Sequence, residues 1–151
     1  MTHEPILGFQ GQYRFLSNFW VDDPIFFRGL YFKSAEHIYQ SLKTADYEEM
    51  LTIQACATPG DAKRAGKNLT IQENWEDIKY EAMRETVGAK FIGNGRLAYH
   101  LVHTEDAFLE ETNTWHDNYW GCCSCPDCGV TGQNKLGKIL MELRRDLAIW
   151  I

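Results

Sequence analysis

The sequence predicts a helix-rich chain with a few short strands, folded as a single domain over residues 1–151. A length of 151 residues suits one domain with its own core. After residue 34, apolar residues recur at helical spacing in several stretches. Before that point, short β-prone runs alternate with glycine and proline. The chain is 44% hydrophobic and 24% charged, which is ordinary for a globular protein.

Short strands are expected mainly in the first 33 residues. The runs Leu7–Phe9, Ile25–Phe27 and Leu30–Phe32 contain the β-branched and aromatic residues that favour strands. A further short strand is expected over 107–110. These runs supply the few strands of the predicted fold.

The first helix is expected over residues 34–44. Ser34 is a suitable N-cap, because its hydroxyl can accept a hydrogen bond from a free backbone N–H of the first turn. Ile38 and Leu42 lie four residues apart and form an apolar stripe. The stripe predicts that this short helix packs against the core.

A second face of the same helix is polar. Gln40 and Lys43 follow Glu36 by four and seven residues, so the three side chains project from one face of the helix. Tyr39 borders this face. A carboxylate, an amide and an amine on one stripe can line a polar cleft. A solvated helix surface has the same pattern, where each pair contributes only a few tenths of a kcal/mol, and both interpretations stay open.

Two further short helices are expected over 46–56 and 58–66. In the second, Thr58 is the expected N-cap, Pro59 takes the first helical position, and Gly66 is the expected terminator. The densest basic cluster of the chain lies at its end and consists of Lys63, Arg64 and Lys67. The cluster is either a solvated helix end, favoured by the helix dipole, or a phosphate contact.

The remaining helices have longer apolar stripes. The longest is expected over 75–91, with Asn74 as its cap and Gly93 as its end. Asn94 is expected to cap the next helix. The last helix is expected over 136–147, where leucine and isoleucine recur at helical spacing.

An aromatic loop surrounds one acidic residue late in the chain. Asp117 stands among Trp115, Tyr119 and Trp120. A carboxyl group that is partly shielded from water can act as a general acid or base, and exposed indole rings can stack on a flat heterocycle. The alternative is a hydrophobic loop pinned by its aromatic residues, with Asp117 as a turn residue.

A cysteine-rich segment follows this loop. Five cysteines are an odd number, and four of them lie between Cys122 and Cys128, which is not a disulfide framework. Cys123, Cys125 and Cys128 are candidate ligands for a structural zinc ion, with His116 or His103 as a further ligand. The alternative is a loop of free thiols. Either reading indicates a reducing, cytoplasmic compartment.

The net charge and the hydropathy of the chain exclude some function classes. A net charge of −6 argues against wrapping of long nucleic acid, although a local basic pocket for phosphates is compatible with it. No apolar run approaches the roughly 20 residues of a membrane span. The N-terminal residues lack the pattern of a signal peptide.

Several blocks of residues, spread in order over about residues 9 to 145, form a specific set. They are Phe15 to Phe19, Ser34 to Gln40 with Lys43, Thr58-Pro59 with Ala62-Lys63 and Gly66, Trp75 with Met83, Lys90-Phe91 and Asn94, Asp117 with Trp120-Gly121, and Gly132 through Asn134 to Gly137 with Leu140-Met141 and Arg144. This ordered set resembles the NADAR family of YbiA-like N-glycosidases. The cysteine run between Gly121 and Gly132 departs from the family's simplest pattern, in which this loop is short and glycine-rich.

The resemblance implies a single α+β domain, rich in helix, that cleaves a ribose C1–N bond. The implied substrates are phosphoribosylamino-pyrimidine intermediates of riboflavin synthesis or ADP-ribosylated guanine in nucleic acid. No redox cofactor or metal is required for the reaction. The implied catalytic residues are Glu36, Lys43 and Asp117. The implied substrate-binding residues are Arg14, Asn18, Phe19, Tyr39, Gln40, Lys63, Trp75, Trp120, Gly121 and Asn134.

Two rival functions belong to other classes. One is a module that binds ADP-ribose or a nucleotide without cleaving it. The other is a zinc-dependent interaction domain organised by the cysteine segment, which would lose its fold on chelation. The sequence does not indicate an oligomeric state.

Overall fold

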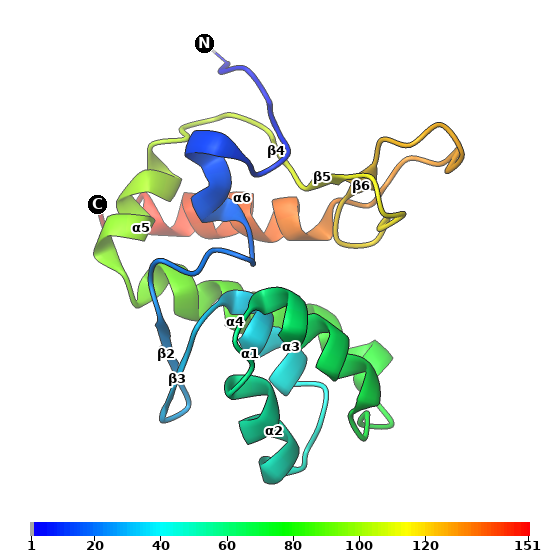
Figure 1. Ribbon diagram of the computed structural model, residues 1–151. Helices are drawn as coiled ribbons and strands as arrows, with labels where there is room; N and C mark the ends of the chain where they lie inside the picture. Colours follow the sequence, from blue (N-terminus) through cyan, green and yellow to red (C-terminus); the bar gives the residue numbers. More distant parts are fainter. Residues whose placement is uncertain (1) are drawn as a thin grey trace. The chain divides into compact units, whose positions relative to one another are not determined.

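The computed structural model describes residues 2–151 and divides them into two compact units (Figure 1). The first unit comprises the chain up to Ser17 together with Asn94–Ile151, and the second comprises Asn18–Gly93. The prediction of a helix-rich fold with a few short strands is confirmed. The prediction of a single domain stays a prediction. No helix within residues 2–151 combines the length and apolarity that crossing a membrane requires.

The second unit is built around helix α1 (Ala35–Ser41). Helices α2 (Tyr47–Gln54), α3 (Pro59–Ala65) and α4 (Trp75–Ile92) all pack against it. Every residue of α1 is buried. The solvated-face interpretation of this helix is therefore wrong, because helices cover its polar side as well as its apolar stripe.

A β-hairpin completes this unit. Strands β2 (Ile25–Phe27) and β3 (Leu30–Phe32) pair antiparallel as expected, and β2 packs against α4. The connecting residues Arg28 and Gly29 both have positive φ, at 48° and 86°. Two successive left-handed residues are the signature of a tight two-residue hairpin turn.

All four expected residues occupy the N-cap position of their helix, and at three of them the side chain makes the capping hydrogen bond. Ser34, Thr58 and Asn94 each accept a backbone N–H with their side chain. Within the described chain, Asn74 makes no such hydrogen bond. Gly66 is also not a left-handed terminator. Its φ is −58°, and the chain continues into the 3₁₀-helix η2 (Gly66–Asn68).

In the first unit, the last helix, α6 (Lys135–Leu147), packs against α5 (Gly95–Val102) and strand β4 (Leu109–Glu110). The strands of this unit form two short parallel pairs. Their members are β1 (Ile6–Leu7) with β4, and β5 (Thr112–Asn113) with β6 (Cys122–Cys123). The 3₁₀-helix η1 spans Gly11–Leu16. The strand expected over 7–9 ends at Leu7, because Gly8 adopts a positive φ of 85°.

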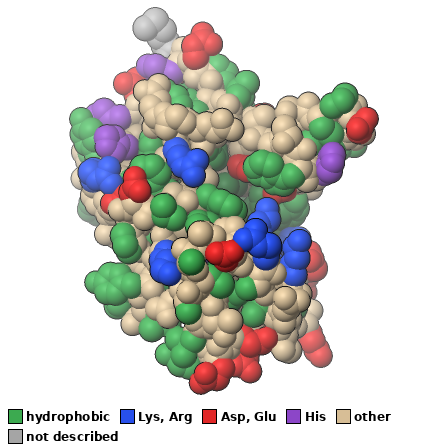
Figure 2. Space-filling view, viewed as in Figure 1, with side chains coloured by type: hydrophobic (Ala, Val, Ile, Leu, Met, Phe, Trp, Pro, Cys, Tyr) green, Lys and Arg blue, Asp and Glu red, His purple; other side chains and the backbone are tan. Residues whose placement is uncertain are grey.

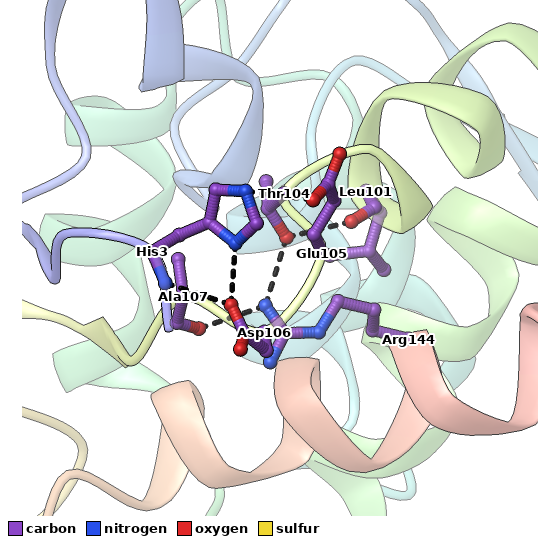
Figure 3. Close-up of polar contacts among 7 residues, drawn as sticks. All are labelled: His3, Leu101, Thr104, Glu105, Asp106, Ala107 and Arg144. Carbon is purple, nitrogen blue, oxygen red and sulfur yellow. Dashed lines mark hydrogen bonds and ion pairs between the residues drawn. The ribbon is translucent and has the colours of Figure 1, made fainter. Parts of the chain in front are cut away.

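A polar network holds α6 to the chain that follows α5 (Figure 3). The Nη1 atom of Arg144 donates to Thr104 Oγ1 at 2.9 Å and to the carbonyl of Ala107 at 2.8 Å. The imidazole of His3 contacts Asp106 and Glu105 on the same connector. Hydrogen bonds from a charged donor to partly buried acceptors are among the stronger ones, so Arg144 fixes the end of α6 to this connector.

His37 links α1 to the carbonyl of Cys56 through a fully buried ring. Its Nδ1 accepts from the hydroxyl of Ser34 at 2.7 Å, and its Nε2 donates to the Cys56 carbonyl at 3.0 Å. Burial lowers the pKa of His37 from the ordinary value of 6.5, with the Cys56 carbonyl opposing that effect. Both nitrogens are thus occupied in the neutral ring.

We expect the stability of the protein to fall in mild acid because of His37. A lowered pKa in the folded state means that the unfolded chain binds the proton more readily, so the free energy of unfolding declines as pH falls below about 6.5. Urea unfolding of wild type and His37→Gln, between about pH 8 and about pH 5, measures this. The variant should lose less stability across that range, whereas His103→Gln should match wild type. Equal pH dependence in wild type and His37→Gln would contradict the assignment.

Candidate active site

A buried carboxylate and amide form the centre of the site in the second unit. Glu36 is 8% exposed and Gln40 is 3% exposed. They stand one helical turn apart on α1, and Gln40 Nε2 donates to Glu36 Oε1 at 2.7 Å. Among residues 2–151, Gln40 Oε1 is a buried oxygen without a hydrogen-bond partner. An unpaired buried acceptor costs free energy, and functional sites are where such acceptors recur.

Gly66 makes room for this pair. A Cβ atom built on Gly66 would lie 1.9 Å from Gln40 Oε1 and 2.8 Å from its Cδ. Any side chain at this position would therefore displace the amide of Gln40. Gly66 follows the last residue of α3 as its C-cap, and its missing side chain allows close packing against α1.

The amine of Lys43 lies beside the same group. Its Nζ stands 5.7 Å from the centre of the Tyr39 ring, and that ring packs against Trp75 at 5.4 Å between centroids. Burial lowers the pKa of Lys43, Glu36 opposes the shift, and Lys63 adds to it. The site therefore favours the neutral, nucleophilic form of this amine more than water does.

Asn18 and its neighbour Phe19 belong to the second unit as well. The carbonyl of Asn18 accepts from the backbone N–H of Glu36 at 3.0 Å. The side-chain amide of Asn18 donates to the sulfur of Met83 at 3.3 Å. Asn18 thus positions the first turn of α1, and Phe19 follows it as a half-buried ring.

The surface of this unit carries both signs of charge. Basic side chains gather near α3 and acidic ones over α2 (Figure 2). Lys63, Arg64 and Lys67 are exposed, and Arg64 pairs with Asp61 at 2.5 Å. The predicted phosphate-binding residue Lys63 is therefore close enough to Lys43 to affect its pKa while reaching solvent.

Asp117 is held by backbone groups in the first unit. Its Oδ1 accepts from the N–H of Tyr119 at 3.1 Å and of Trp120 at 2.9 Å. Its own backbone N–H and carbonyl both bond to the side chain of Asn113, a buried residue. The segment around Asp117 is thus a hydrogen-bonded turn, and its side chain is partly buried.

Gly121 and Asn134 help to position the same turn through contacts with neighbouring segments. A Cβ atom on Gly121 would lie 1.8 Å from Glu111 Oε2, so the glycine allows close approach. The side chain of Asn134 accepts from the N–H of Glu111 at 3.0 Å and donates to the carbonyl of Leu109 at 2.9 Å. These bonds tie the start of α6 to β4, and the role of Asn134 in binding a sugar stays a prediction.

The predicted metal ligands lie together and include a histidine. Donor atoms of His116, Cys123, Cys125 and Cys128 all lie within 4.8 Å of one another, so the group could hold a metal ion. His103 is not a member, because its Nδ1 contacts the carbonyl of Tyr99 on α5. Of the two histidines considered from the sequence, the structure brings His116 to the cysteines.

The predicted residues thus form two groups, one in each unit. Glu36, Tyr39, Gln40, Lys43, Lys63 and Trp75 gather around α1, and Asp117, Trp120, Gly121 and Asn134 gather around the turn after β5. Arg14 lies on η1 and is exposed. A cavity of about 450 Å³ in the first unit, between β1 and β5, is lined by none of the predicted catalytic or substrate-binding residues, although Trp115 of the aromatic loop borders it.

Sequence reasoning missed Gly66 as a packing residue and Asn113 as the support of Asp117. A glycine in the middle of a predicted helix would have indicated close packing. Gly66 stands at the expected end of its helix, where glycine is common as a terminator, so its packing role was not apparent. Asn113 lies only four residues before Asp117, but no local pattern marks it as the support of that turn.

The fold and these two groups define a helix-rich α+β protein with a buried acid, amide and amine in one unit and a backbone-held acid in the other. A family model described as the NADAR domain matches residues 8–148. The chain therefore belongs to the NADAR family, and the predicted family and fold class are confirmed.

Relatives with curated names agree with this family. N-glycosidase YbiA of Escherichia coli strain K12 is 37% identical over 129 residues, covering 83% of this chain and 77% of that protein. The NMR structure of E. coli YbiA matches with a TM-score of 0.84 and 34% identity, over 99% of this chain and 88% of that one.

Two further relatives extend the comparison. An N-glycosidase of Nostoc punctiforme is 34% identical over 122 residues, which cover 78% of this chain and 75% of that protein. A riboflavin biosynthesis protein of Vibrio vulnificus is 34% identical over 136 residues, covering 88% of this chain but 35% of that longer protein.

We expect Gly66→Ala to disturb the centre of the site. The added methyl group would push the Gln40 amide away from Glu36, and overpacking of this kind costs about 1–3 kcal/mol. Thermal and urea unfolding measure the loss. Gly60→Ala in the neighbouring helix α3 is the matched control, because its Cβ would meet nothing nearer than 3.5 Å. Equal stability of the two variants would show that Gly66 is not needed for packing.

Proposed function

We propose that this chain is an N-glycosidase that hydrolyses a ribose C1–N bond. The observation that carries the proposal is the buried Glu36–Gln40 pair with the Lys43 amine beside it. A protein interior rarely keeps a carboxylate, an unpaired amide oxygen and a partly buried amine together without a functional reason. The names of the curated relatives support the same activity.

Two carboxylates suit the charge that develops when such a bond breaks. The sugar gains positive, oxocarbenium-like charge, which a nearby carboxylate stabilises, and the leaving base gains negative charge, which a proton donor neutralises. Glu36 and Asp117 are proposed for these two tasks, with the division of labour left to experiment. Water adds at C1, the C1–N bond breaks, and the departing nitrogen takes a proton.

Lys43 has two proposed roles, of which the structure favours neither by geometry alone. As a cation, it would orient Glu36 or a substrate phosphate. As a neutral amine, it would attack C1 of a ring-opened sugar, form a C–N bond and release the base as an amine. Water would then hydrolyse this Schiff base, releasing the sugar as an aldehyde and restoring the amine.

The substrate is proposed to be a nucleotide-like molecule. Trp120 would stack on the base or sugar, Asn18 and Asn134 would bind sugar hydroxyls, and Arg14 with Lys63 would bind phosphate. The unpaired Oε1 of Gln40 offers an acceptor for a substrate hydroxyl or amine. Phe19, Tyr39, Trp75 and Gly121 complete the proposed set.

Two substrate classes remain as proposals. One is a phosphoribosylamino-pyrimidine, as the riboflavin biosynthesis name of the Vibrio relative suggests for that protein. The other is ADP-ribosylated guanine in nucleic acid. The net charge of −6 suits recognition of one modified nucleotide better than tracking of a long strand.

The proposed reaction needs no redox cofactor and no metal. We propose that a metal held by the His116 and cysteine cluster has a structural role. The five cysteines are free thiols, and thiols crowded in this way persist in a reducing compartment. A cytoplasmic location is proposed on that ground.

We expect Glu36→Gln to abolish release of the sugar product. Removing an acid–base or charge-stabilising carboxylate lowers turnover by roughly 100- to 10,000-fold. The measurement is chromatography with mass detection on an ADP-ribosylated guanine oligonucleotide and on a phosphoribosylamino-pyrimidine. Glu48→Gln, an exposed change on α2, should retain wild-type turnover. If wild type binds ADP-ribose tightly but releases no product from either substrate, the chain is a binding module.

We expect the variant Lys43→Arg to distinguish between the two proposed roles of Lys43. Arginine keeps the positive charge but cannot form a Schiff base, so turnover survives if the charge alone matters. If the amine attacks C1, borohydride should trap a sugar adduct on Lys43 in wild type only. Trapping should then increase with pH through the pKa of Lys43, which lies below the ordinary value of 10.5 because of burial. The matched control is Lys138→Arg, an exposed change on α6.

A further inference from the structure

The cluster of His116, Cys123, Cys125 and Cys128 stands apart from the proposed glycosidase chemistry. His116 lies in the turn after β5, Cys123 ends β6, and the other two cysteines follow within five residues. The imidazole Nδ1 lies 3.3 Å from Cys128 Sγ, 3.4 Å from Cys125 Sγ and 3.8 Å from Cys123 Sγ. Cys125 Sγ and Cys128 Sγ are 3.4 Å apart.

Four of the six separations are close to the edges of a tetrahedron around one zinc ion, and all six are within 4.8 Å. With Zn–S near 2.3 Å and Zn–N near 2.0–2.1 Å, tetrahedral geometry places two sulfurs about 3.8 Å apart and a sulfur and a nitrogen about 3.6 Å apart. The four distances between these donor atoms lie within a few tenths of an ångström of those values. Three thiolates and an imidazole are a ligand set that selects zinc.

Hydrogen bonds hold the backbone near the ligands at a few points. The N–H of Cys123 donates to Asn118 Oδ1 at 2.9 Å, and the N–H of Ser124 donates to the carbonyl of Asn113 at 2.8 Å. The N–H of Cys125 points at Cys123 Sγ, 3.5 Å away. An amide aimed at a ligand sulfur stabilises the thiolate form, and the bonds to Asn118 and Asn113 hold the backbone at two points near the ligands.

The segment that carries the cluster has almost no core of its own. Within the described stretch 114–132, Gly121 is the one buried residue. The parallel pair β5–β6 contributes two residues from each strand. Segments with so little burial need a cross-link to stay ordered, and metal ions serve this purpose in small folds.

We propose that His116, Cys123, Cys125 and Cys128 bind one structural zinc ion, and that this ion clamps the turn that carries Asp117 and Trp120. His116 directly precedes Asp117, and Cys123 follows two residues after Gly121. The ion therefore joins the two ends of the turn. Any effect of the ion on turnover rests on the proposed glycosidase function. Zinc binding and the clamp on the turn do not depend on it.

Metal content of the purified chain tests the ligand set. Elemental analysis should give about one zinc per chain for wild type and a loss in His116→Ala and in Cys125→Ser. The matched controls are Cys122→Ser, next to a ligand in sequence but outside the cluster, and Cys56→Ser in the other unit. These two should keep their zinc. Wild type without zinc after purification under reducing conditions in added zinc, or equal content in all variants, would overturn the proposal.

Cobalt substitution tests the geometry. Co²⁺ bound by three thiolates and an imidazole in a tetrahedron should give strong visible bands and thiolate charge-transfer bands. Both should disappear in Cys125→Ser and persist in Cys122→Ser. The weak bands of octahedral cobalt would overturn the assignment. A disulfide between Cys125 and Cys128 in the freshly reduced and repurified protein, detected by mass, would do the same.

Hydrogen exchange tests the clamp without any substrate. The amides of Tyr119 and Trp120, which donate to Asp117 Oδ1, should exchange at least tenfold faster after chelation, a change of about 1.4 kcal/mol in local stability. Amides of α1 should be unchanged. Bound zinc with unchanged exchange would overturn the clamp. Faster exchange in a protein without glycosidase activity would leave the clamp standing and refute the proposed function instead.

Discussion

The hydrogen bond between Gln40 and Glu36, inside a helix buried on all sides, is the constraint on which the second unit depends. A buried carboxylate is unfavourable unless hydrogen bonds or charges compensate for its lost hydration. The chain supplies an amide from the next turn, and an amine from Lys43 whose charge Glu36 supports. The glycine at position 66 and the cap at Ser34 then follow from the need to place this pair without strain.

The two proposed catalytic carboxylates are held in different ways. Glu36 is positioned by side chains on its own helix, so its orientation depends on close packing around α1. Asp117 is positioned by two backbone N–H groups and by the buried amide of Asn113. Asp117 is thus oriented by backbone donors, whereas Glu36 is oriented by a side-chain amide from the next helical turn. The difference gives the two acids a physical basis for different roles.

Local chemistry made much of this structure predictable from the sequence. Capping residues such as Ser34, Thr58 and Asn94 act within one turn, and the apolar stripe of the last helix repeats every three to four residues. The contacts of Asn113 with Asp117 and of His116 with the cysteines are short in sequence, but they depend on how the turn folds. Gly66 acquires its role only when distant segments meet, so no window of sequence contains the reason for it. The burial of the polar face of α1 was ambiguous for the same reason, because the helices that cover it come later in the chain.

The cysteine segment shows how a short stretch of chain can stay ordered without a hydrophobic core. Side chains between 114 and 132 are half-buried or exposed apart from Gly121, so apolar burial contributes little to holding Asp117 in place. Asn113 and Asn118 anchor the backbone at two points, yet both bonds face partial solvent and are worth about 1 kcal/mol each. A zinc–thiolate site contributes far more than that sum. An ion bound between His116 and Cys128 would therefore dominate the local stability of the turn, and the geometry of its four donors is the reason to expect one there.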